Sequence, residues 1–208
     1  MKNKILLLFL GYCFVLLFSA VSCIRCKSGK VADYKINGII LKLSDAKLQT
    51  DSAKNWIFNN IEDSMVNFKN YAIQIIPNIV QLSATTNKIP SFSILPQAFA
   101  CSPREGQILD RIENIKITCN KDFDELHPAG TDLKMLFVVL ADAPYSSSTE
   151  IISMSEFLTL KKMYEKFYFL LKSPPSNSDD FEFRVELFVD GIDYDYYDLK
   201  TKKVYLNI

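Results

Sequence analysis

Alternation of apolar and polar side chains across residues 181–189 restricts the fold of this chain more than any other feature. Glu182, Arg184 and Glu186 separate apolar residues that occupy every second position. A period of two places the two sets on opposite faces of a β-strand, so the segment predicts a strand with one buried face. The buried set is expected to be Phe181, Phe183, Val185, Leu187 and Val189, whereas Phe188 falls on the polar face.

The residues after this strand predict a hairpin. Asp190-Gly191 is a turn dipeptide, because glycine tolerates the positive φ that tight hairpin turns require. The returning segment, residues 192–197, is then expected to place Tyr194 and Tyr196 on the inner face of the sheet.

Further short apolar segments predict an all-β fold. Strands are expected at residues 34–43, 71–76, 111–119, 136–140, 167–171 and 204–206. Residues 44–70 predict a long irregular segment with at most one short helix, near Trp56. A second short helix is expected at residues 155–160, capped by Ser153 or Ser155. The pattern favours an antiparallel β-sandwich, immunoglobulin-like, with at most one or two short helices, and an open barrel is the alternative.

The first residues predict export and lipidation. Lys2 and Lys4 precede an apolar run over residues 5–18, and small residues then lead to Cys23. The run is shorter than the roughly 20 apolar residues of a membrane-spanning helix. We expect a lipoprotein signal peptide over residues 1–22, whose removal leaves Cys23 to carry the diacylglycerol and palmitate-type chains of a lipid anchor.

The expected organisation follows from that cleavage. Residues 23–32 would form a lipidated tether, and residues 33–208 a single β-sandwich domain in the bacterial cell envelope, lipid-anchored to the outer membrane. The alternatives are ordinary cleavage after Ala20 or Ser22, which leaves Cys23 as a thiol, and an uncleaved anchor. Lysine and arginine total 24 against 24 acidic residues, with no run of either sign, so we expect no nucleic-acid partner.

Cysteine and histidine usage predicts no metal site or cofactor. Cys26, Cys101 and Cys119 would share an oxidising compartment, where they allow one disulfide in any of their pairings and leave one thiol over. They lack zinc-ligand spacing with His127, the only histidine. We expect Cys119 to be a small buried residue at a strand end, and His127 to bond a backbone carbonyl in its loop.

Two carboxylate clusters and one aromatic cluster are the remaining candidates. The carboxylates are Asp122, Asp124 and Glu125, and Asp193, Asp195 and Asp198. Neither cluster has the spacing of a calcium loop, and solvated turn or strand carboxylates explain both. The aromatic residues Tyr194, Tyr196, Tyr197 and Phe188 form a possible binding surface for sugars or protein partners, with core and sheet-rim packing as the alternative.

Motifs through the middle of the chain resemble a family of uncharacterised lipoproteins from the Bacteroidota. They comprise Ala100-Cys101-Ser102-Pro103, Ile115-Lys116-Ile117-Thr118, Asp122-Phe123-Asp124, His127-Pro128-Ala129-Gly130-Thr131-Asp132-Leu133, Phe137 and the Pro174-Pro175 loop. The resemblance implies an envelope lipoprotein with an all-β domain, and implies no activity. It also implies a disulfide between Cys26 and Cys101.

These observations together predict a non-enzymatic lipoprotein. It would be attached to the membrane by its lipid anchor and would bind an envelope protein or a glycan. One alternative is a hydrolase of envelope or other polysaccharides that uses Asp122, Asp124 or Glu125. Another is a structural component of a surface assembly.

Overall fold

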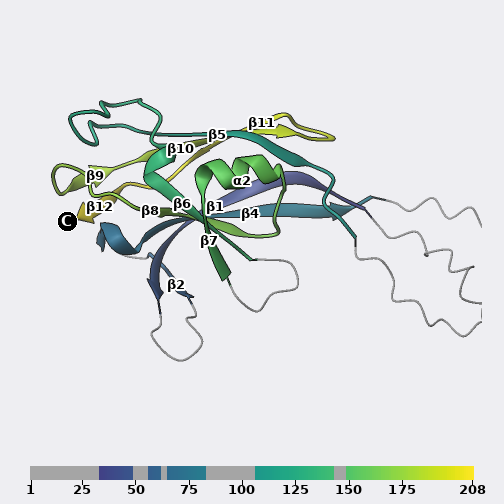
Figure 1. The fold of residues 1–208 in the computed structure, drawn as a ribbon, viewed down its shortest axis with the longest axis horizontal. Coiled ribbons are helices and arrows are strands. Elements are labelled where there is room, and N and C mark those ends of the chain that lie inside the picture. The colour runs from purple at the N-terminus through teal and green to yellow at the C-terminus, as the bar shows by residue number, and fades with distance from the viewer. Residues whose placement is uncertain (1–32, 49–55, 62–64, 83–105, 143–148) are drawn as a thin grey trace, which may run out of the picture. The chain divides into compact units, whose positions relative to one another are not determined.

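The computed structural model describes residues 33–48, 56–61, 65–82, 106–142 and 149–208 (Figure 1). Most of them belong to antiparallel strands, which form sheets packed against each other, and this confirms the predicted all-β sandwich. The strands are β1 (Tyr34–Leu48), β2 (Trp56–Asn60), β3 (Met65–Asn67), β4 (Tyr71–Gln81), β5 (Arg111–Cys119), β6 (Phe137–Asp142), β7 (Thr149–Ser153), β8 (Phe167–Leu171), β9 (Asp179–Phe181), β10 (Phe183–Asp190), β11 (Tyr196–Lys200) and β12 (Val204–Asn207). The helices are the 3₁₀ turns η1 (Phe68–Asn70) and η2 (Lys134–Leu136) and the α-helix α2 (Met154–Leu160).

The larger layer is a six-stranded sheet in the order β2-β1-β4-β8-β6-β7. Every residue of the central strand β8 is buried. Phe167 and Phe169 belong to the main core, whereas Tyr168 and Leu170 belong to a smaller apolar cluster. Since β8 is covered on both faces, its unbroken apolar run does not need the alternation that marks a half-exposed strand.

The second layer is the three-stranded sheet β11-β10-β5, which packs against the larger sheet and lies above it in Figure 1. Its middle strand β10 confirms the predicted alternation, because Phe183, Val185, Leu187 and Val189 are buried in the main core. The predicted strand is interrupted at Glu182. Its backbone N–H donates to the side-chain oxygen of Asn120, and its carbonyl oxygen accepts the backbone N–H of Asn120. The residues before that break form β9, which joins the small sheet β3-β12-β9, in which β12 and β3 are parallel.

Helix α2 covers part of the core beside β5 and β6 and confirms the predicted helix. The Ser153 hydroxyl accepts the N–H of Glu156 at 3.1 Å, as expected of an N-cap. Phe157 is fully buried, and its ring centroid lies 5.3 Å from that of Phe167.

The prediction of an irregular segment over residues 44–70 was wrong for the residues of it that the structure describes, 44–48, 56–61 and 65–70. β1 continues to Leu48, and the residues around Trp56 form strand β2 rather than a helical turn. Phe58 of β2 stacks on Tyr168 with ring centroids 3.7 Å apart, so contacts with a strand distant in sequence stabilise the extended conformation.

The hairpin between β10 and β11 differs from the predicted tight turn. Residues 191–195 separate the two strands, and Gly191 does not have a positive φ. A side chain at Gly191 would collide with the carbonyl oxygen of Tyr194 and would lie 2.9 Å from Oδ1 of Asp110. Close approach of the chain, rather than a left-handed conformation, therefore requires glycine at this position.

Candidate binding site on the outer sheet face

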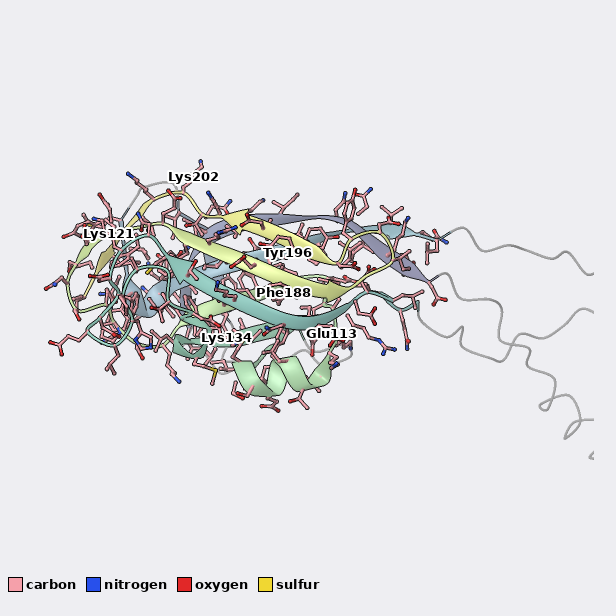
Figure 2. All side chains as sticks on the ribbon, turned by 90° about the horizontal axis from the view of Figure 1, so that it is seen from above. Glu113, Lys121, Lys134, Phe188, Tyr196 and Lys202 are labelled. Carbon is pink, nitrogen blue, oxygen red and sulfur yellow. The ribbon has the colours of Figure 1, made fainter. Side chains whose placement is uncertain are left out.

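The side chains of β5, β10 and β11 that alternate with the core residues form three cross-strand rows, and all but the buried Thr118 are at least partly exposed. In register, these rows are Lys200, Arg184 and Thr118; Asp198, Glu186 and Lys116; and Tyr196, Phe188 and Asn114. We call these nine residues the outer sheet face. Figure 2 looks onto this sheet and labels Phe188 and Tyr196 on its adjacent strands β10 and β11.

A connected polar network covers most of the outer sheet face. Arg184 donates two hydrogen bonds to the Asp198 carboxylate, from Nε at 2.7 Å and from Nη2 at 2.8 Å. The Tyr196 hydroxyl donates to Oε1 of Glu186 at 2.7 Å, and Lys116 Nζ lies 3.5 Å from Oε2 of the same carboxylate. Paired planar groups of this kind hold one another in position.

The network changes the acidity of its members. The hydrogen bond from Arg184 lowers the pKa of Asp198, and the hydrogen bond from Tyr196 lowers the pKa of Glu186. The same Tyr196 bond raises the pKa of that phenol, so the hydroxyl remains a donor. Each shift favours the charge states in which the network is fully bonded.

These shifts predict that stability decreases in acid. Carboxylates with a lowered folded-state pKa stabilise the protein above their unfolded pKa of about 4, and this stabilisation disappears as pH falls through the folded value. The urea midpoint should therefore decrease as the pH is lowered below about 5 and should be level above it. Asp198→Asn should reduce that dependence, and an identical pH profile in wild type and variant would refute the assignment.

Two aromatic rings lie exposed on this network. Phe188 is 37% and Tyr196 is 42% exposed, and their ring centroids are 5.3 Å apart with the planes tilted by 52°. The predicted inward orientation of Tyr194 and Tyr196 was wrong, because both are exposed and Tyr197 packs against the core instead. Five residues separate the strands instead of two, and this odd difference shifts the register so that Tyr196 lies opposite Phe188 on the outer face.

Tyr194 and Tyr197 form a second aromatic contact at the hairpin. Their ring centroids lie 5.8 Å apart. Burial raises the pKa of Tyr197, which is half-buried, whereas Tyr194 is 53% exposed. Of the predicted aromatic surface, Phe188 and Tyr196 therefore lie together on the sheet, Tyr194 lies in the loop, and Tyr197 is mainly a packing residue.

The first carboxylate cluster forms caps within its own loop. Oδ1 of Asp124 accepts the backbone N–H groups of Leu126 and His127, and lies 2.7 Å from Nδ1 of His127. Burial raises the pKa of Asp124, but the hydrogen bonds from His127 and Leu126 outweigh it and the net pKa is lowered. Asp122 likewise accepts the N–H of Ala129 at 2.8 Å. His127 thus bonds a carboxylate rather than the expected backbone carbonyl, and Glu125 is exposed.

The second carboxylate cluster does not converge. Asp193 pairs with Lys35 at 2.6 Å, Asp198 bonds Arg184, and Asp195 is exposed in the hairpin. No group of three or more histidine, cysteine or acidic side chains suited to a metal ion occurs in the part of the chain that the structure describes.

Cys119 is a free, buried thiol at the end of β5, as predicted. Burial raises its pKa, and Sγ donates to the carbonyl oxygen of Lys121 at 2.9 Å. The predictions for Cys23, Cys26 and Cys101, and for the signal peptide and tether, lie outside the described residues.

Asp110 is a structural residue that the sequence did not reveal. It is 1% exposed, and its carboxylate accepts the N–H of Ile36 at 2.8 Å and of Ile192 at 3.0 Å. It thereby joins β1 to the hairpin that follows β10. An isolated aspartate next to a strand gives no sequence signal for partners 74 and 82 positions away.

Comparisons with protein-family models, curated proteins and solved structures found no match to this chain. Within the described residues, no helix is both long and apolar enough to cross a membrane.

Proposed function

We propose that this chain is a cell-envelope lipoprotein whose β-sandwich is a non-enzymatic binding module. The export signal and Cys23 support the lipid anchor in the outer membrane. The observation that carries the binding role is a pair of exposed rings on the outer sheet face, Tyr196, whose hydroxyl is bonded to Glu186, and Phe188, which packs against Tyr196. Aromatic side chains fixed in this way lose little conformational freedom when a ligand contacts them.

Two of the three carboxylates considered for hydrolysis have structural contacts, whereas Glu125 is exposed. Asp122 and Asp124 both accept backbone N–H groups of their own loop. The geometry therefore favours a binding module over a hydrolase for this domain.

The anchor and the disulfide have a direct test in the intact mass of the full chain taken from its own cell envelope. A polypeptide beginning at Cys23 and carrying lipid is the expected result. The resemblance implies that Cys26 and Cys101 pair, so two further alkylatable thiols should appear only after reduction. A lipid-free chain that begins elsewhere would contradict the anchor.

The binding role predicts that envelope material co-purifies through the outer sheet face. The tagged full chain, extracted mildly from its own cells, should retain a protein or saccharide component. A Phe188→Ala, Tyr196→Ala double variant should retain about tenfold less of this component than the wild type, because both exposed rings are removed. Tyr205→Ala, on strand β12 of another sheet, is the matched control. Equal retention by the double variant and the wild type would overturn the proposed binding face.

A further inference from the structure

The size of the outer sheet face restricts its ligand. Neighbouring strands lie about 4.8 Å apart and residues rise about 3.4 Å, so three strands from Tyr196 to Lys200 cover about 10 Å by 14 Å. A margin of about 5 Å on every side extends this to about 500 Å². A stable protein interface covers about 800 Å² on each partner. These nine residues alone therefore cover less area than one side of a stable protein interface.

The orientation of Tyr196 suits stacking. Its cross-strand neighbour is Phe188, but its hydroxyl reaches Glu186, which lies opposite Asp198 one row away. A tyrosine that bonds a diagonal neighbour must lean along the sheet rather than stand upright from it. The side chain therefore extends along the sheet, and 42% of the residue is exposed. An exposed ring held in this way can stack against the apolar face of a sugar.

The charges on the face argue for a neutral ligand. Arg184 is bonded to Asp198, and Lys116 is paired with Glu186. Lys200 also interacts electrostatically with Asp198. An anionic ligand would have to compete with these existing pairs, whereas sugar hydroxyls can use the acceptor positions that carboxylates keep after one or two bonds.

We propose that the outer sheet face binds a neutral glycan, with a sugar ring stacked on Tyr196 beside Phe188 and its hydroxyls bonded to Glu186 and Asp198. This inference rests on the proposed binding function and names its ligand class.

Affinity electrophoresis of the full chain in mild detergent tests the proposal. The gels contain galactomannan, xyloglucan, mixed-linkage β-glucan or dextran as neutral probes, and polygalacturonate as the anionic probe. At least one neutral polymer should retard the wild type and the Tyr205→Ala control. Tyr196→Ala should weaken that retardation about tenfold. Tyr196→Phe should weaken it less, since it keeps the ring and loses only the bond to Glu186.

The outcomes separate the glycan from the binding face itself. Migration unaffected by every neutral polymer, or retarded only by polygalacturonate, overturns the neutral-glycan proposal. If a protein alone then co-purifies in a manner that depends on Phe188 and Tyr196, the binding function stands and only the glycan is wrong. If no material depends on those residues, both fail. Thermal unfolding of each variant distinguishes lost binding from lost folding.

Discussion

Phe183→Ala is expected to lower the free energy of unfolding by about 3–5 kcal/mol. The Phe183 side chain is fully buried where the two layers meet. Its ring centroid lies 5.2 Å from that of Tyr71, on the opposite sheet, and 6.0 Å from that of Phe137. Alanine would leave a cavity that the two packed sheets cannot close. Urea denaturation followed by circular dichroism measures the loss.

The matched control for Phe183 lies on the same strand. Phe188 has the same side chain but is 37% exposed on the outer sheet face. Phe188→Ala should cost about 1 kcal/mol or less, because solvent already reaches the ring and little cavity forms. Similar losses for the two variants would contradict the assignment of opposite faces of β10.

Asp110→Ala should destabilise the protein by about 3 kcal/mol. The substitution leaves the N–H groups of Ile36 and Ile192 without the carboxylate that accepts them. The Ile36 bond is buried, and an unsatisfied buried donor costs about 1–3 kcal/mol, whereas the Ile192 bond is only part-buried and adds less. It also removes one of the links between the hairpin and β1, so amide hydrogen exchange at Ile192 should become faster. Urea unfolding measures the energetic part of this effect.

Two control variants test whether the buried carboxylate of Asp110 causes this loss of stability. Asp110→Asn keeps one acceptor oxygen and should lie between wild type and Asp110→Ala. Asp193→Ala removes a partly exposed ion pair with Lys35 from the same hairpin and should cost about 1 kcal/mol or less. If Asp193→Ala costs as much as Asp110→Ala, the buried carboxylate is not what secures the hairpin.

The outer sheet face was only partly visible in the sequence. Alternation in β10 placed Arg184, Glu186 and Phe188 on the polar side of their strand, as the structure confirms. The pairings with Asp198 and Tyr196 were not predictable, since they depend on the register between β10 and β11. That register follows from the length of the connection, which the Asp190-Gly191 dipeptide alone predicted wrongly.

Local patterns of side chains determined the all-β class, the inner face of β10 and the position of the short helix α2. A side-chain period of two decides which residues share a face of one strand, whatever its partners are. Tertiary structure decided which strands pair, the extended conformation of Trp56 and Phe58, the sheet face on which each side chain of β11 lies, and the burial of Asp110. Each of these depends on contacts between residues far apart in the chain, whose energies no local pattern of side chains contains.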